Sequence, residues 1–233
     1  IMVARDIELA KKYGGHLHIA HVSTARSVEL INEAKNFGVN VTAEVTPHHL
    51  TMTDSWFLGH QRDTDVFVSL GTDAYDSNLK VNPPLRTRTD IASLLTGLKE
   101  GIIDAIATDH APHALQDKVT TLDDAAYGIN GLETAFTLLA SLYHKNILDI
   151  VEIINRLTLG AVKVISNSIE KPKGIIKGEL ADIVLLDLNS DTTIVGKDFI
   201  SKSKLTPLEG MTFKGRVVLT LAKGSVVYDG NNN

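Results

Sequence analysis

An acidic residue and two histidines stand together where a short apolar run of the chain ends. The run is 101–107, and Asp109, His110 and His113 follow it directly. Such a run is typical of a buried strand of a parallel sheet, and ligand sites in parallel α/β folds lie at the carboxyl ends of these strands. An unpaired carboxylate is costly beside a buried strand, so we expect Asp109 to have a partner. The sequence favours a metal ion as that partner; the alternative is an aspartate that caps the next helix.

Two other histidine positions also follow apolar runs. His21 lies within the run 17–22, near the carboxyl end of an expected strand, and either binds a ligand or is a hydrogen-bonded core residue. His48 and His49 follow a second run, 39–45, after Thr-Pro. Adjacent side chains of an extended chain point to opposite sides, so at most one of this pair faces a site. Direct contact and a structural role both stay open for the pair.

Two loops carry groups that suit recognition of an amide or an anion. Residues 82–86 read Asn-Pro-Pro-Leu-Arg, and two prolines exclude a regular helix there. The amide of Asn82 suits an amide or imide group, whereas the alternative is a stiff turn with an exposed arginine. Tyr127 and Gly128 precede a predicted helix, and backbone N–H groups at such a place can bind an oxyanion or a carbonyl. A plain loop-to-helix junction explains Tyr127 and Gly128 equally well.

The order of the elements predicts a scaffold that positions these residues. Up to about residue 165, short apolar runs alternate with helical periodicity, which is typical of an α/β array with a parallel sheet. Residues 111–129 and 55–80 are expected to be loops, the latter with a short strand at 65–70 as the alternative. Strands are expected at 17–22, 39–45 and 101–107, and helices at 1–13, 24–37, 89–99 and 132–144, with two shorter helices reaching about residue 166.

The composition changes near Lys171, where a β-rich tail begins. A strand is expected at 182–188 and a hairpin at 217–229, turning at Lys223 and Gly224. We therefore expect two domains. Residues 1–170 would form a partial (β/α) barrel of a metal-dependent hydrolase, and residues 171–233 a β-rich C-terminal segment.

The overall composition narrows the functional class. The 233 residues are 43% hydrophobic and 22% charged, as in ordinary globular proteins. A net charge of −5 without a basic cluster gives no reason to expect a nucleic acid or a membrane surface as partner. The absence of cysteine excludes disulfides and thiolate metal sites and is in keeping with a cytoplasmic location. Any metal would be held by His, Asp, Glu or a modified Lys.

Four strings, taken in order, resemble the bacterial type of dihydroorotase in the amidohydrolase superfamily. They are His-Val-Ser-Thr at 21–24, Thr-Pro-His-His-Leu at 46–50, Asn-Pro-Pro-Leu-Arg at 82–86 and Asp-His-Ala-Pro-His at 109–113. The resemblance implies the C-terminal portion of a TIM-type (β/α)8 barrel plus part of the β-sandwich of that superfamily. It also implies zinc-dependent, reversible hydrolysis of the cyclic amide of dihydroorotate to N-carbamoyl-aspartate, a step of pyrimidine biosynthesis.

The resemblance assigns roles to individual residues. It makes His48 and His49 structural or supporting residues rather than ligands. The chemistry it implies is attack by a zinc-bound hydroxide on the ring amide, with Asp109 carrying the proton to the leaving nitrogen. The resemblance makes His21 and Asp109 zinc ligands, and Asp109 is also the proton-transfer base. Asn82 and His113 would contact the substrate, with His113 binding its carboxylate. Tyr127 and Gly128 would contact the ring amide, largely through their backbone.

The same resemblance implies parts that this sequence does not contain. In the family, two zinc ions per site are also held by a His-X-His pair, a bridging carboxylated Lys or Asp and a further His. These, and an Arg and an Asn that bind the carboxylate, would precede residue 1. Residues 1–13 look like an amphipathic helix without a cap, so we expect a C-terminal part of a longer chain. We expect it to be inactive unless another segment or chain completes it.

Two other functions stay open. One is another cyclic amidase, such as a hydantoinase, a dihydropyrimidinase or an allantoinase, although the four strings favour dihydroorotase among these. The other is a non-catalytic subunit that supports a partner such as aspartate transcarbamoylase. The missing ligands favour this second alternative, whereas the presence of Asp109 and His113 counts against it. The resemblance further implies a homo-oligomer.

Overall fold

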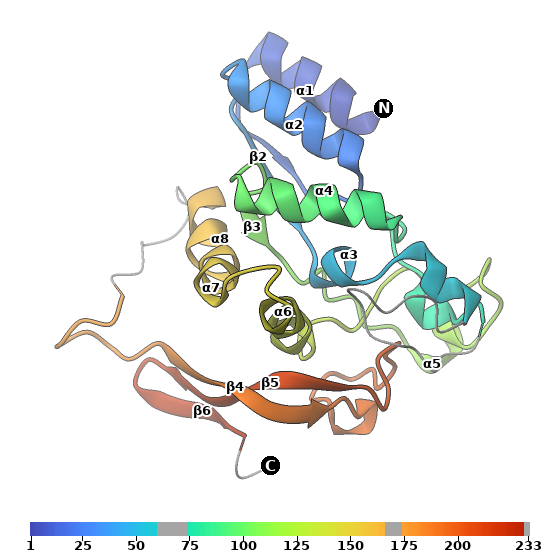
Figure 1. The fold of residues 1–233 in the computed structure, drawn as a ribbon, viewed down its shortest axis with the longest axis vertical. Coiled ribbons are helices and arrows are strands. Elements are labelled where there is room, and N and C mark those ends of the chain that lie inside the picture. Colours follow the sequence, from blue (N-terminus) through green and yellow to red (C-terminus); the bar gives the residue numbers. More distant parts are fainter. Residues whose placement is uncertain (60–73, 166–173, 231–233) are drawn as a thin grey trace.

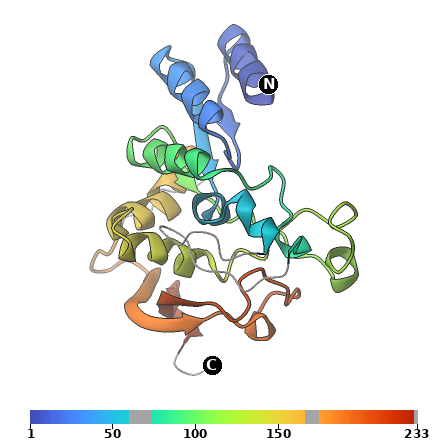
Figure 2. The same ribbon diagram turned by 45° about the vertical axis from the view of Figure 1, so that its right-hand side comes forward.

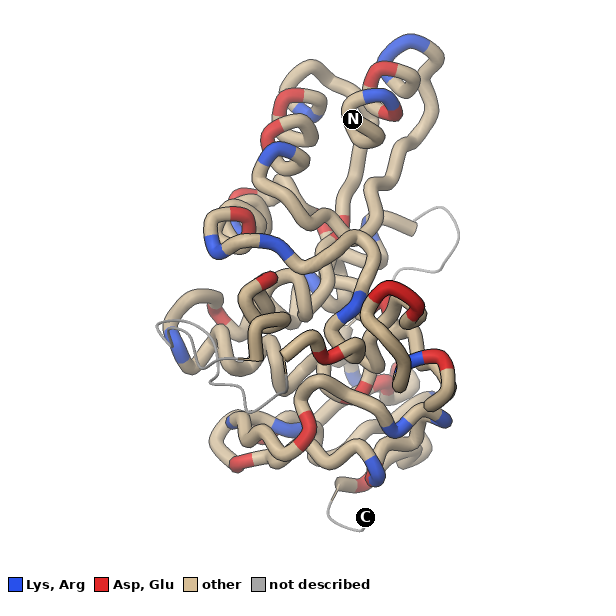
Figure 3. The backbone as a smooth tube through the Cα atoms, turned by 90° about the vertical axis from the view of Figure 1, so that its right-hand side faces the viewer, with Lys and Arg blue, Asp and Glu red and all other residues tan. Residues whose placement is uncertain are grey.

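The computed structural model of the chain describes residues 1–59, 74–165 and 174–230. The molecule is layered along its long axis, with α1 (Met2–Tyr13) and α2 (Ala25–Asn36) at one end and an antiparallel sheet at the other (Figure 1 and Figure 2). A parallel sheet and further helices lie between them. Basic and acidic residues are both scattered over the described chain, as Figure 3 shows. None of the described helices is long and apolar enough to span a membrane.

The parallel sheet is formed by β1 (Leu17–Ile19), β2 (Val41–Val45) and β3 (Ala105–Ile106), in that spatial order. Leu17 lies beside Val41 in the first pair of strands, and Glu44 beside Ala105 in the second. Alternate residues of β2 are buried, as a strand with one packed face requires. Helices α1, α2 and α4 (Arg88–Lys99) contribute apolar side chains to the same core. The predicted α/β array is confirmed for these elements.

Threonine side chains fix where two of these helices begin. The Thr24 hydroxyl accepts a hydrogen bond from the amide of Ser27 and caps α2. Thr87 and Asp90 form a reciprocal capping box at the start of α4. Because β2 ends one residue before Thr46, which caps α3 (Pro47–Thr51), the short helix starts directly at the edge of the sheet. These caps place the turns that follow the strands.

Several predicted boundaries differ from the structure. Residues 101–103 are not part of β3, because Gly101 adopts a φ of 77° at the end of α4 and the chain turns there. The expected loop 111–129 contains the short helix α5 (Leu115–Lys118). The helix expected from residue 132 begins later, as α6 (Ala135–His144). The expected loop at 55–80 includes two 3-10 helices, η1 (Asp54–Leu58) and η2 (Ser77–Leu79), and the alternative strand at 65–70 lies outside the described residues.

The C-terminal layer is an antiparallel sheet that packs on α6. Its strands are β4 (Ile183–Thr193), β5 (Thr212–Ala222) and β6 (Ser225–Asp229), and β5 and β6 join at Lys223 and Gly224 as predicted. Leu139 of α6 belongs to the core of the parallel sheet, whereas Leu138 packs with side chains of the antiparallel layer. The remaining elements are α7 (Ile150–Leu157), α8 (Leu159–Val164) and η3 (Gly196–Asp198).

Candidate active site

The carboxyl ends of β1 and β3 carry His21 and Asp109. All three strands are parallel, so both residues follow strands at the same edge of the sheet, with β2 between them. Both have left-handed backbone conformations, with φ of 39° at His21 and 46° at Asp109. Residues other than glycine adopt this region rarely, and such conformations cluster at functional sites. The two residues predicted from the sequence to be metal ligands therefore also share an unusual backbone conformation of the kind found at functional sites.

Asp109 is exposed to solvent rather than held beside the buried strand. The expectation that burial forces a partner on this carboxylate is therefore wrong, because the chain has already left the sheet core at this point. The alternative, an Asp109 that caps the next helix, is also wrong. The residue at the N-cap of α5 is Ala114. Asp109 is thus an exposed carboxylate at the mouth of the sheet.

The described residues do not form a complete metal site. No group of three or more His, Asp or Glu side chains within the described ranges is arranged to hold a metal ion. Catalytic zinc sites use three protein ligands and structural zinc sites four, so His21 and Asp109 alone do not fit such an ion. We therefore derive no reaction step through a metal from these residues.

His48 and His49 lie on α3, and both are only 2% exposed. The imidazole rings of His48 and His49 are tilted against each other, with their centroids 4.6 Å apart. Burial holds the pKa of His48 well below its ordinary value, and the charges of His49 and His21 act in the same direction. Burial also lowers the pKa of His49 to about 4. Both rings are therefore neutral at pH 7, in agreement with a structural role.

The hydrogen bonds of His49 determine which of its ring nitrogens carries the proton. Its Nε2 lies 2.9 Å from the carbonyl oxygen of Pro83, which can only accept, so Nε2 carries the hydrogen. Its Nδ1 lies 2.7 Å from the hydroxyl of Thr46, which therefore donates to it. His49 thus connects the end of β2 to the loop that begins with Asn82.

The loop 82–86 is held on both sides. The peptide between Asn82 and Pro83 is cis, and the amide of Asp54 donates to the carbonyl of Arg86 at 3.0 Å. Asn82 itself is exposed. Arg86 is half-buried, so the alternative of a stiff turn with an exposed arginine is wrong. The loop presents the Asn82 amide to solvent from a fixed backbone.

His113, Tyr127 and Gly128 meet in one corner. The imidazole Nε2 of His113 lies 2.8 Å from the carbonyl oxygen of Tyr127, to which it donates. A Cβ added at Gly128 would lie 2.6 Å from the Ala111 carbonyl oxygen and 2.9 Å from His113 Nε2, so only glycine fits. The Gly128 amide donates to the Lys80 carbonyl at 2.9 Å. The structure therefore joins the loop of His113 to the segments around residues 80 and 128.

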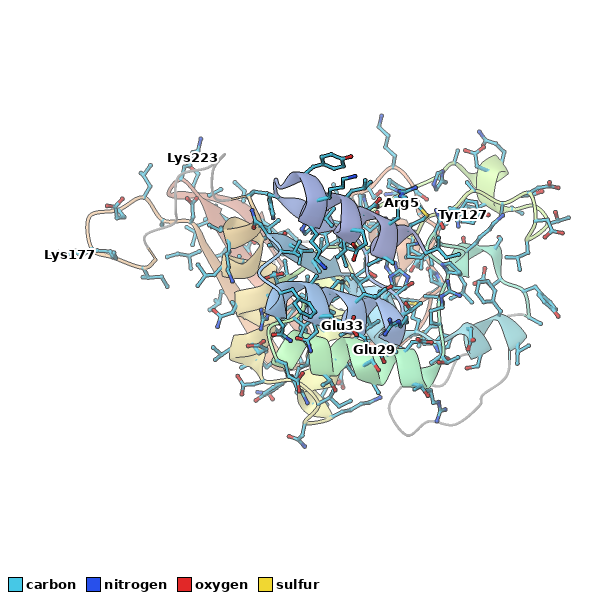
Figure 4. The ribbon with its side chains drawn as sticks, turned by 90° about the horizontal axis from the view of Figure 1, so that it is seen from above. Arg5, Glu29, Glu33, Tyr127, Lys177 and Lys223 are labelled. Carbon is cyan, nitrogen blue, oxygen red and sulfur yellow. The ribbon has the colours of Figure 1, made fainter. Side chains whose placement is uncertain are left out.

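The corner has an open and a closed side. Tyr127 is 58% exposed, and the Lys80 ammonium lies 4.4 Å from the centroid of its ring. Figure 4 shows Tyr127 on the opposite side of the molecule from Lys177 and Lys223. A small cavity of about 10 Å³, with room for about one water molecule, is lined by Gly128, His113 and Asn130 together with residues of the C-terminal layer such as Ser203. Small polar groups can thus approach the corner from the Tyr127 side.

Two of the histidines in the first part of the chain lie outside this arrangement. His16 and His18 both contact the hydroxyl of Thr42, at 2.7 and 2.8 Å, and His18 also lies 3.2 Å from the Glu44 carboxylate. Both are hydrogen-bonded residues at or directly before β1.

The sequence did not indicate Lys118, whose side chain is buried beside the corner. A single lysine in a polar loop gives no signal that it is buried.

Comparison with known proteins supplies the family. A family model described as the amidohydrolase family matches residues 1–227 of the chain. The chain belongs to the amidohydrolase family. Among solved structures, the L-hydantoinase (dihydropyrimidinase) of Arthrobacter aurescens superposes with a TM-score of 0.81 and 29% identity, over 97% of this amidohydrolase chain and 48% of its own. The dihydropyrimidinase of Brevibacillus agri NCHU1002 has a TM-score of 0.82 at 24% identity and supports the fold alone, over the same fractions.

Curated relatives of this amidohydrolase carry the name dihydroorotase. The protein of Thermoanaerobacter sp. (strain X514) is 46% identical over 98% of this chain, which corresponds to 49% of the relative. The protein of Ehrlichia canis (strain Jake) is 43% identical over 100% of this chain and 48% of its own length. The chain spans about half the length of the relatives it matches.

Proposed function

We propose that this amidohydrolase chain belongs to a dihydroorotase and carries its substrate-recognition corner. In that reaction, water adds to the ring amide of dihydroorotate, the ring C–N bond breaks, and N-carbamoyl-aspartate forms; the reverse cyclisation releases water. The observation that carries the proposal is the contact of His113 with Tyr127 and Gly128. Relatives named dihydroorotase at 46% and 43% identity support it.

The substrate combines one carboxylate with a cyclic imide-like ring, and the corner offers a group for each. Because the Nε2–H of His113 already donates to the Tyr127 carbonyl, the ring would bind the carboxylate through Nδ1–H, which only the imidazolium form carries. The exposed amide of Asn82 and the backbone of Tyr127 and Gly128 are the groups that we propose for the ring amide; the Tyr127 carbonyl oxygen accepts from His113 and has a second lone pair for a ring N–H. Backbone groups held by glycine are well suited because no side chain blocks the approach.

Asp109 is the group that we propose for proton transfer. It is exposed at the mouth of the sheet, where a carboxylate can take a proton from attacking water and return it to the leaving ring nitrogen. His21 and Asp109 would also be two of the ligands of a zinc ion in the complete site. Because the described residues supply no third ligand, the roles argued for this chain are binding, orientation and proton transfer.

The finer description of the fold is part of the same proposal. We infer that β1 to β3 with their helices are the C-terminal portion of a TIM-type barrel, over residues 1–170, and that residues 171–233 belong to a β-sandwich. The parallel strands with one site-bearing edge support this inference. Assembly with further copies, a transcarbamoylase partner, a cytoplasmic location and a place in pyrimidine biosynthesis stay predictions.

A chimera tests the proposed function. This chain would replace the segment that it matches in the Thermoanaerobacter relative, and dihydroorotate, hydantoin, dihydrouracil and allantoin would be assayed side by side. We expect hydrolysis of dihydroorotate with the other three at least about 100-fold slower, as unpaired polar groups in the site reject the wrong ring. The Asp109→Asn form of the chimera should lose about 100-fold or more.

The other functions give different results in the same experiment. A chimera that prefers hydantoin or dihydrouracil would contradict the proposal and favour the cyclic amidases named for the structural neighbours. A folded, zinc-loaded chimera without any activity would favour a non-catalytic subunit. The chain by itself, purified and assayed with added zinc, is expected to be inactive.

A further inference from the structure

Lys118 is a buried lysine beside the recognition corner to which the proposed reaction assigns no role. Its side chain, at the end of α5, is 3% exposed. A buried ammonium group is costly unless acceptors surround it. The charge of Asp76 favours the ammonium, and the hydrogen bonds of Nζ go to neutral backbone groups. These groups account for the burial of a lysine there.

Three backbone carbonyl groups surround the ammonium. Nζ donates to the carbonyl oxygens of Ser77 at 2.9 Å, Ala126 at 3.0 Å and Lys80 at 3.3 Å. An ammonium has three N–H donors, and each finds an acceptor here. Hydrogen bonds of a charged donor are about twice as strong as those of neutral groups. Lys118 thus makes three charge-assisted hydrogen bonds to two separate segments of the chain.

The two segments are those that lead into the recognition residues. Ser77 and Lys80 precede Asn82, and Ala126 precedes Tyr127 and Gly128. The Lys80 carbonyl accepts from the Gly128 amide at 2.9 Å as well as from Lys118. Further bonds tie α5 to the same segments: the Ser77 hydroxyl donates to the Lys118 carbonyl, and the Ala126 amide donates to the Asp117 carbonyl at 2.9 Å.

We propose that Lys118 is a positioning residue that sets the spacing between the Asn82 loop and the Tyr127–Gly128 segment. Without the ammonium, three carbonyl oxygens of these loops lose their shared donor. Carbonyl dipoles that converge on one point repel one another, so the two segments are expected to separate. The contact of Gly128 with Lys80 would open first, and the groups that recognise the ring amide would lose their fixed distance.

Lys118 carries the positive charge that this role needs at neutral pH. Burial lowers the pKa of Lys118 to about 8, and the charge of Asp76 acts in the opposite direction. The group is therefore mostly an ammonium at pH 7. The neighbouring Lys80 ammonium is directed elsewhere, to the Asp123 carbonyl at 2.8 Å. The experiments below are therefore set at pH 7.

Hydrogen exchange of the full chain tests the positioning role directly. Lys118→Met removes the charge and leaves an unbranched side chain one atom shorter; Lys99→Met makes the same change at an exposed position on α4 and is the control. We expect the Gly128 amide to exchange at least 10-fold faster in Lys118→Met than in the control. The Val22 amide, bonded to the Glu44 carbonyl at 2.9 Å in the sheet, should be unaffected. Equal protection of Gly128 in both variants would overturn the proposal, and so would equal acceleration of Gly128 and Val22, which indicates global destabilisation.

Ligand titration gives a second readout, and only this part rests on the function proposed above. Dihydroorotate is titrated into the folded wild-type chain and both variants and followed through the Gly128 amide signal. We expect at least 10-fold weaker binding to Lys118→Met and unchanged binding to Lys99→Met. If all three bind alike, Lys118 does not position the site. If the wild-type chain does not bind, the recognition role proposed for it is contradicted, and the exchange result alone decides the role of Lys118.

Discussion

Replacing Gly128 by alanine should separate the recognition corner, because a methyl group has no room there. The added Cβ would lie 2.6 Å from both the Cβ and the carbonyl oxygen of Ala111, and 2.9 Å from His113 Nε2. The Cβ and the carbonyl oxygen of Ala111 are attached directly to its backbone and cannot rotate away. The segment around Gly128 itself must therefore move. Its φ of 150° adds a second cost, since side-chain-bearing residues rarely adopt it.

The size of the effect follows from these two terms. Overpacking of a tight contact costs about 1–3 kcal/mol, and an unfavourable positive φ about 1–2 kcal/mol. The gain from a less flexible unfolded chain offsets about 0.4–1 kcal/mol. We expect Gly128→Ala to lower the free energy of unfolding by about 2–4 kcal/mol. Gly38→Ala is the matched control, because Gly38 also has a positive φ, 75°, but no atom within 4 Å of its added Cβ.

Urea denaturation of the wild type and the two variants measures this difference. We expect Gly38→Ala to lose about 1 kcal/mol or less, since only the backbone term applies to it. The reasoning is refuted if the two variants lie within about 0.5 kcal/mol of each other, which would mean that the close contacts of Gly128 carry no cost. In the chimera proposed above, Gly128→Ala should also weaken dihydroorotate binding, whereas Gly38→Ala should not.

Two further predictions concern stability. The folded pKa of His49 is about 4, below the ordinary 6.5 of the unfolded chain, so the unfolded state binds more protons between these values. Acidification from pH 7 to 4.5 should therefore destabilise the chain by about 2–3 kcal/mol through this residue. His49→Gln should flatten the dependence of the urea midpoint on pH; an unchanged slope would contradict the assignment. Asp104 is 4% exposed in its side chain and lies 2.7 Å from Lys35 Nζ, so Asp104→Asn should cost about 3 kcal/mol. A double-mutant cycle with Lys35→Met measures the pair, and a coupling near zero would show that the amide of Ala43, not Lys35, matters for Asp104.

The sequence predicted those parts of the fold whose signal is local. Thr24 and the periodic apolar residues of α2 place that helix to within a residue or two, and Lys223 with Gly224 places the hairpin turn. Predictions failed where a distant contact decides the structure. Residues 101–103 are apolar because they pack under the helix end, not because they pair in a strand, and an apolar run alone does not distinguish the two.

The candidate site divides in the same way. His21 and Asp109 could be placed at one edge from sequence because each follows a strand and the strands were expected to be parallel. That they also share a left-handed backbone could not be predicted, since neither is a glycine. The corner of His113, Tyr127 and Gly128 depends on hydrogen bonds between backbone groups of loops far apart in the chain. Backbone amide and carbonyl groups are nearly the same at every residue, so the sequence does not indicate which carbonyl will accept a hydrogen bond from a given amide.

This difference predicts which substitutions will affect stability and which only binding. Asn82 and Tyr127 are exposed, so under the proposed function their replacement should remove contacts to a ligand while the loops keep their backbone hydrogen bonds. Gly128, His49 and Lys118 are buried and hold segments together, so their replacement changes both properties at once. The distinction matters for any functional test, because a loss of activity at a buried position does not by itself identify a residue that contacts substrate. Only an exposed residue whose loss leaves the unfolding free energy unchanged can be assigned to recognition on activity alone.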